Sequence, residues 1–133
     1  MTAPQDVTLD VLHPQLDSLL YGAVAAVLAV QAVLPGMLEA RSGTLLCTTG
    51  GGAVTPYPML ADTNIAQAGQ RNWALNLHHT LADQGIFAAN VAINLVIAAQ
   101  APEGVPHRAP DLIALDHWHL HTTRERAEHV IGT

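Results

Sequence analysis

The longest apolar stretch of the chain lies in its first third. Residues 19–34 are apolar at every position but one. This stretch is shorter than the roughly 18–20 residues that a membrane-spanning helix needs, so it predicts a helix that is buried on most sides. We expect the helix to run from about residue 8 to residue 40, with Thr8 or Asp10 as its cap and a bend or break at Pro35-Gly36.

Two further apolar segments predict strands. Residues 44–49 are β-branched at three positions and flanked by glycines, which is typical of a buried strand. A longer strand is expected over residues 87–97, and helices are expected over residues 62–84 and 111–130. The resulting order of helix, strand, helix, strand, helix is typical of α/β folds, in which right-handed crossovers build a parallel sheet.

Three consecutive glycines, Gly50 to Gly52, follow the first predicted strand. A glycine run at this place indicates either backbone in an unusual conformation or backbone that another group approaches closely.

The composition narrows the classes of function. Half of the 133 residues are hydrophobic and only 12% are charged, which predicts one domain with an apolar patch buried against a partner. The net charge of −6 and the 4% of aromatic residues argue against a nucleic-acid surface. The chain contains no Lys, which rules out Schiff-base chemistry. The single Cys47 cannot form an internal disulfide, and residues 1–13 lack a secretory signal, so we expect a cytoplasmic protein outside the membrane.

Several segments resemble, in order, parts of the short-chain dehydrogenases/reductases. They are residues 34–37 (LPGM), 43–52 (GTLLCTTGGG), 65–75 (IAQAGQRNWAL), 85–86 with 91–93, and 118–128 (WHLHTTRERAE). The resemblance covers about residues 8–130 and concerns the C-terminal half of the family's domain. It implies a truncated Rossmann-like fold, with a small parallel sheet and long packing helices, in a single domain without the dinucleotide-binding half.

The sequence departs from this family at the residues that carry its chemistry. The family's glycine-rich turn for dinucleotide phosphates has no counterpart, and the spacing of Gly50 to Gly52 differs from it, so no cofactor is expected. The family's catalytic Tyr, Lys and Ser align with Thr63, Gln67 and Gly50, and its Asn falls near Leu19 or Gly22. Because none of these residue types is retained, the resemblance implies that NAD(P)-dependent redox activity is lost.

Polar residues near the two strand ends form the predicted site, because open α/β sheets bind ligands at the carboxyl ends of their strands. We expect a small-molecule ligand there, enclosed by residues 100–121. The candidate catalytic residues are Thr49, Tyr57, Asp62, Asp116 and His117, and the candidate substrate-binding residues are Thr48, Gly50, Asn64, Gln67, Asn94 and Trp118. The alternative is that these are loop and cap residues without chemistry.

Two histidines of the last predicted helix share one face. His117 and His121 are spaced i, i+4, and this spacing can bind zinc if Asp116 or His129 joins them. The HExxH motif is absent, so we favour a polar helix surface and expect no metal. The charged side chains of residues 124–128 are expected to form a solvated face.

The two long helices are expected to form a subunit interface. In the family, the helices that residues 8–40 and 62–84 resemble form a four-helix dimer interface, so the resemblance implies a homodimer. Arg71 lies in the second of these helices and is expected either to pair with an acid at a subunit contact or to reach solvent.

Three functions fit these observations. The favoured one is a cofactor-independent enzyme of cyclase, isomerase or dehydratase type, acting on an apolar metabolite as in secondary metabolism, because the strand-end loop keeps polar groups around a glycine-rich bend. The alternatives are a non-catalytic dimeric binding or scaffold protein, and an oxidoreductase completed by a partner chain.

Overall fold

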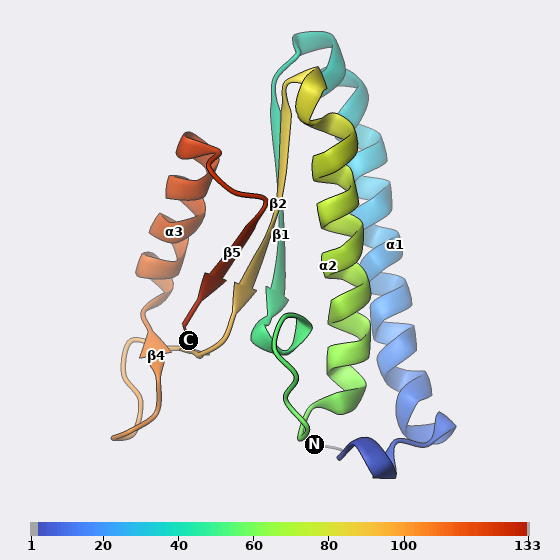
Figure 1. The fold of residues 1–133 in the computed structure, drawn as a ribbon, viewed down its shortest axis with the longest axis vertical. Coiled ribbons are helices and arrows are strands. Elements are labelled where there is room, and N and C mark those ends of the chain that lie inside the picture. Colours follow the sequence, from blue (N-terminus) through green and yellow to red (C-terminus); the bar gives the residue numbers. More distant parts are fainter. Residues whose placement is uncertain (1–2, 133) are drawn as a thin grey trace.

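The chain folds around a three-stranded parallel sheet with helices on both faces. The computed structural model describes residues 3–132, apart from the side chains of residues 15, 16 and 18–24. Its main elements are helices α1 (Leu9–Ala40), α2 (Ala61–Leu81) and α3 (Pro110–Thr123), and strands β1 (Gly43–Gly50), β2 (Ile86–Ile93), β3 (Val96–Ile97), β4 (His107–Arg108) and β5 (Glu128–Ile131). The sheet has the order β1-β2-β5, with α1 and α2 on one face and α3 on the other (Figure 1). This arrangement confirms the predicted α/β fold.

The first helix is continuous through both of its prolines. Thr8 caps α1 as predicted, with its Oγ1 accepting from the amide of Val11 at 3.4 Å. The helix passes Pro35-Gly36 without interruption and ends at Arg41, which takes a left-handed conformation with φ 49°. Among the described residues, no helix is both long and apolar enough to cross a membrane.

The second strand is shorter than predicted. β2 ends at Ile93, where its pairing with both neighbouring strands also ends, at Gly50 of β1 and Ile131 of β5. The amide of Asn94 makes the last hydrogen bond of the pairing with β5, to the carbonyl of Ile131 at 2.8 Å. Val96–Ile97 then pairs in parallel with His107–Arg108, away from the main sheet. The prediction of one strand over residues 87–97 is therefore wrong beyond Ile93, since apolar residues continue on both sides of Asn94 and conceal the end of the strand.

The last helix is also shorter than predicted. α3 ends at Thr123, and Arg124 takes a left-handed conformation with φ 51°. Residues 128–130, predicted as helix, belong to β5, which pairs with β2. This strand is too short, and begins with too polar a pair of residues, to be predicted from hydrophobic periodicity.

The sheet is buried unevenly. β2 lies between two strands and is buried along almost its whole length, while β1 pairs on one side only among the described strands, so its other edge is open. In β1 itself only Leu45 and Thr49 are buried, so the prediction of a fully buried strand is wrong.

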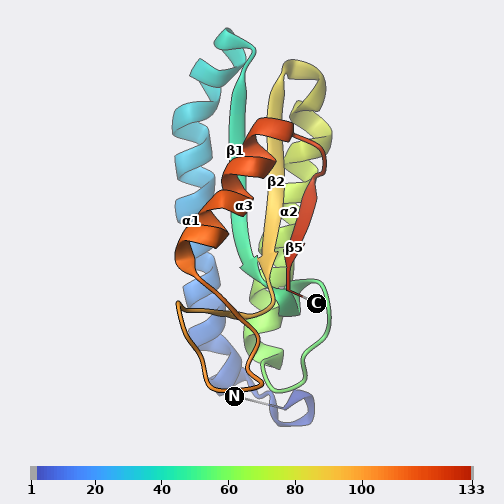
Figure 2. The same ribbon diagram turned by 90° about the vertical axis from the view of Figure 1, so that its left-hand side faces the viewer.

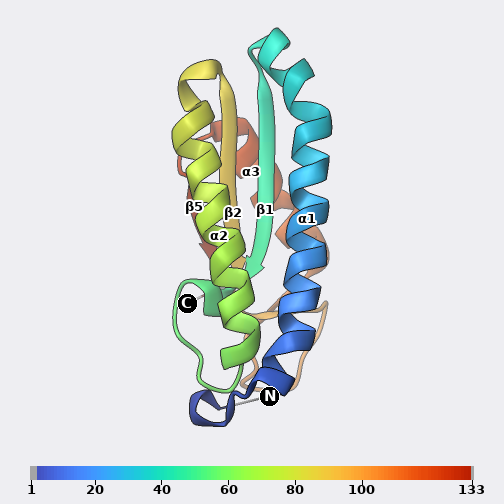
Figure 3. The same cartoon turned by 90° about the vertical axis from the view of Figure 1, so that its right-hand side faces the viewer.

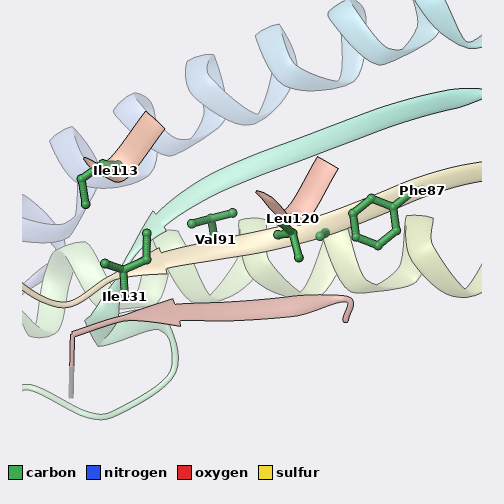
Figure 4. Packing of buried hydrophobic residues seen from close by; sticks show 6 residues of the cluster. Phe87, Val91, Ile113, Leu120 and Ile131 are labelled. Atoms are coloured by element: carbon green, nitrogen blue, oxygen red, sulfur yellow. The ribbon is translucent and has the colours of Figure 1, made fainter. Parts of the chain in front are cut away.

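Two hydrophobic clusters lie on opposite faces of the sheet. On the α3 face, residues of β2 and β5 pack against Ile113 and Leu120 (Figure 4). On the other face, Leu45, Ile86 and Ala88 pack against the two long helices, which lie side by side over the sheet (Figure 3). Successive residues of β2 thus point to opposite layers, as the strand period requires.

Candidate functional site

A pocket of about 430 Å³ lies where β1 and β2 end. Its lining contains five of the predicted site residues, namely Gly50, Tyr57, Asn64, Gln67 and Asn94. Apolar side chains complete it, among them Ile93, Leu95, Val96 and Val105. We call this space the strand-end pocket.

Each glycine of the run lies against a side-chain amide. The amide nitrogen of Gly50 donates to Oε1 of Gln67 at 2.8 Å. A Cβ atom at Gly51 would overlap the side chain of Asn94, and one at Gly52 would overlap that of Asn64. None of the three has a positive φ. Of the two interpretations that the sequence left open, close approach is therefore confirmed.

The need for space at Gly51 can be tested by adding one methyl group. Gly51→Ala is expected to lower the free energy of unfolding by about 1–2 kcal/mol, because the root of the Asn94 side chain must move. Gly69→Ala is the matched control, since Gly69 lies in α2 with open space around it. Alanine in a helix is favoured over glycine, so this change should stabilise by about 0.5–1 kcal/mol. Equal effects of both changes in thermal unfolding would contradict the close contact.

The strand-end pocket offers hydrogen bonds without charge. The Oε1 atom of Gln67 is used by Gly50, so its amide NH₂ remains as a donor. Asn64 donates from Nδ2 to the carbonyl of Tyr57 at 2.9 Å, and its Oδ1 remains as an acceptor. The phenol of Tyr57 is the single titratable group in the described lining. Such a pocket suits a neutral ligand with a few polar atoms.

A chain of polar side chains crosses the α2 face of the sheet and holds Thr49. The hydroxyl of Thr49 donates to Oδ1 of Asn90 at 3.0 Å, and Nδ2 of Asn90 donates to Glu128 at 3.3 Å. Arg71 holds the same carboxylate through Nε and Nη2, the latter at 2.7 Å. Thr49 is buried and its proton is already donated, so it does not face the strand-end pocket as a free hydroxyl.

The two members of the ion pair in this network shift each other's pKa. The hydrogen bonds from Arg71 lower the pKa of Glu128, and Glu128 in turn raises the pKa of Arg71. The partner of Arg71 is thus an acid of the same chain, and the expectation of a partner across a subunit contact is wrong. The expected solvated face over residues 124–128 is also wrong for Glu128, which lies on β5.

The remaining predicted site residues lie elsewhere. Thr48 points to the α3 face, where its Oγ1 lies 3.1 Å from Nε2 of His117. His117 and Trp118 line a second space of about 790 Å³ between α3 and β1, which we call the α3 groove. It shares no lining residue with the strand-end pocket, so the single site expected from sequence is divided between two faces of the sheet.

The two predicted aspartates lie in the lining of neither space. Asp116 pairs with Arg108, whose Nη2 donates to it at 2.9 Å. Asp62 is buried at the start of α2, and its Oδ1 has no hydrogen-bond partner among the described groups. In the part of the chain that is described, no three His, Cys, Asp or Glu side chains gather as a metal site.

Comparison with known proteins identifies the class of fold. No known family profile matches the chain. An NADPH-bound short-chain oxidoreductase from Pseudomonas aeruginosa, described as containing an atypical catalytic center, superposes with a TM-score of 0.75 at 18% identity, over 98% of this chain and 58% of that one. An acetoin dehydrogenase from Salmonella typhimurium gives a TM-score of 0.74 at 18% identity, over 98% and 57%. The chain thus has the fold of part of a short-chain oxidoreductase, over somewhat more than half of the length of these two proteins.

Sequence relatives add a second observation. The mouse protein named inactive hydroxysteroid dehydrogenase-like protein 1 is 27% identical over 131 residues, which is 98% of this chain and 36% of that protein. The human protein of the same name is 27% identical over 110 residues, or 82% and 31%. The chain therefore spans about a third of the length of these curated relatives. Their name agrees with the absence of the family's catalytic residue types at Thr63, Gln67 and Gly50.

Proposed function

We propose that this protein binds a neutral, largely apolar small molecule in the strand-end pocket and does not transfer hydride. The observation that carries the proposal is the pocket itself, in which the amides of Gln67, Asn64 and Asn94 surround three glycines and none of the described lining residues is charged. The name of the curated relatives, which contains both "inactive" and "hydroxysteroid", favours a neutral polycyclic ligand such as a steroid.

Binding is favoured over catalysis because the pocket lacks a second acid or base. A cyclase, isomerase or dehydratase reaction needs a proton carrier at the reacting atoms, and among the described lining residues only Tyr57 has an acidic or basic side chain. If the pocket is catalytic after all, Tyr57→Phe should abolish turnover. If it only binds, the same change should leave affinity within a few fold of the unaltered protein.

The ligand class can be tested by thermal unfolding with progesterone, cholate and NADPH as probes. We expect progesterone, which is neutral, to raise the melting temperature, because a ligand that binds only the folded state stabilises it by about 2.7 kcal/mol at a hundredfold excess over Kd. Cholate carries a carboxylate that has no basic partner among the described lining residues, so its shift should be much smaller. A shift with NADPH alone would instead favour an oxidoreductase completed by a partner chain.

Two neighbouring residues provide a matched pair of variants for this assay. Val96 lines the strand-end pocket and Ile97 does not, yet both are about half exposed, at 48% and 51%. Val96→Trp should fill the pocket and remove the progesterone shift, whereas Ile97→Trp should keep it. Equal shifts in the two variants would place the ligand elsewhere.

We also propose that the chain forms a homodimer through the outer faces of α1 and α2. A folded protein of this mass is expected to expose about 6,700 Å², and this chain exposes 8147 Å². The excess is larger than the roughly 800 Å² that each partner buries in a stable interface. Large apolar side chains on these helices, Leu28, Val33 and Ile65, are exposed to 60%, 45% and 49%.

A further inference from the structure

A hydroxyl group and an imidazole are paired on the α3 face of the sheet. Nδ1 of His117 lies 2.8 Å from the carbonyl oxygen of Ile113. A carbonyl oxygen can only accept, so Nδ1 of the neutral ring carries the proton and Nε2 holds a lone pair. Nε2 lies 3.1 Å from Oγ1 of Thr48. The Thr48 hydroxyl therefore donates its proton toward the imidazole.

This arrangement has the parts that activate a hydroxyl group for attack on an acyl carbon. A nucleophilic hydroxyl needs a base within hydrogen-bond reach, and the base needs a third group that fixes its orientation. His117 is the base, and the carbonyl oxygen of Ile113 is the third group, which fixes the orientation of the imidazole ring. Thr48 is exposed, so a substrate can reach its oxygen.

The α3 groove beside this pair suits an apolar acyl chain. Its walls include Leu46, Ile113, Ala114 and Trp118, and Trp118 is 62% exposed. Among the described lining residues, only the two histidines have ionisable side chains. α3 lies across the sheet over β1 (Figure 2). The volume of the α3 groove, about 790 Å³, is within the range of small-molecule sites. The outer edge of β1 has no strand neighbour in the described part of the chain, which leaves backbone N–H groups free to bond a carbonyl oxygen.

We propose that Thr48 and His117 form a catalytic pair that hydrolyses esters of apolar acyl groups bound in the α3 groove. The Thr48 oxygen bonds to the acyl carbon while its proton passes to Nε2 of His117. The ester C–O bond then breaks, and the leaving alcohol takes that proton. Water hydrolyses the acyl-threonine with His117 as base, which releases the acid and restores the hydroxyl. This activity goes beyond the proposed ligand binding and uses no residue of the strand-end pocket.

The chain contains its own control for this proposal. His121 lies one turn after His117, and its Nδ1 lies 2.9 Å from Oγ1 of Thr44. Both residues line the same groove. The His121 ring bonds Thr44 and has no carbonyl partner among the described residues, so this second pair has a hydroxyl and an imidazole but lacks the orienting acceptor. It should not react.

The test is incubation of the full chain with p-nitrophenyl hexanoate. Release of nitrophenolate measures the rate of acylation, the mass of the intact protein counts the acyl groups, and peptide mapping locates them. The absence of Lys removes the most common site of unspecific acylation. The thiol of Cys47 is a weak competitor, because burial raises its pKa. We expect one hexanoyl group on Thr48, with Thr48→Ser retaining it and Thr48→Val losing it. His117→Gln should slow its formation by about 100-fold or more.

Matched variants distinguish catalysis by Thr48 and His117 from a loss of activity that is caused by misfolding. Peptide mapping should find no hexanoyl group on Thr44. His119→Gln, on α3 but outside the lining of the α3 groove, should keep acylation at the rate of the unaltered protein, and thermal unfolding should place all of these variants within a few degrees of each other. Absence of any adduct on Thr48, or equal acylation in His117→Gln, overturns the proposal. Val96→Trp, which blocks the strand-end pocket, should leave acylation unchanged, so the two sites fail independently.

Discussion

Leu28→Asp is expected to convert a dimer of this protein into monomers at micromolar concentration. Leu28 lies on α1 and is 60% exposed in the single chain. Burial of a leucine side chain contributes about 1.5–3 kcal/mol, and in a twofold interface each substitution counts twice. The loss of at least about 3 kcal/mol corresponds to a rise in the dimer dissociation constant on the order of 100-fold. Sedimentation velocity over a concentration series measures this dissociation constant.

Leu115→Asp is the control for this experiment. Leu115 is also a helical leucine, exposed to 59%, but it lies on α3, on the opposite face of the sheet. It should leave the dimer intact if the interface is formed by α1 and α2. Dissociation by Leu115→Asp alone would move the interface to the α3 face, and a monomer in the unaltered protein would remove the homodimer altogether.

The elements of the fold that were predicted correctly are those with strong, repeated local signals. A long and almost continuous apolar stretch determines α1, and glycine-flanked apolar runs determine β1 and the start of β2. The end of β2 and the whole of β5 depend on a hydrogen bond and a strand pairing between residues far apart in sequence, such as Asn94 with Ile131. Local pattern contains no information on such pairing.

The candidate site was predicted in composition but not in arrangement. Thr48 and Thr49 are adjacent in sequence, and the strand period sends them to opposite faces, one to His117 and one to Asn90. This alternation of side chains along a strand can be inferred from sequence, and it predicts that Thr48 and Thr49 belong to two different sites. Asn90 was also available as a signal, because a polar residue inside an apolar strand predicts a buried hydrogen bond. Its partner Glu128 was not, because it lies in a charged run that resembles a solvated surface.

Arg71→Met is expected to lower the free energy of unfolding by about 2–3 kcal/mol at neutral pH. Removal of one member of a buried pair leaves the other charge without compensation, which costs about 3–5 kcal/mol when the pair is fully buried. Here the side chains of Arg71 and Glu128 are 30% and 25% exposed, so solvent reduces the cost. The same change also loosens Asn90 and Thr49, since they bond through the Glu128 carboxylate. Arg126→Met is the control, because Arg126 pairs with Glu125 at a more exposed position and should change stability by less than about 1 kcal/mol.

The dependence of this effect on pH gives a second measurement of the same pair. Arg71 lowers the pKa of Glu128 in the folded chain, so the unfolded chain takes up a proton at higher pH than the folded one. The stabilisation is therefore complete above the ordinary Glu pKa of about 4.3 and is lost as the pH falls through the lowered folded value. Urea unfolding from pH 7 to pH 3 should show a steeper loss of stability for the unaltered protein than for Arg71→Met, and the two curves should converge in acid. Parallel curves would mean that Arg71 does not lower the pKa of Glu128, and that the hydrogen bond from Asn90 fixes the carboxylate instead.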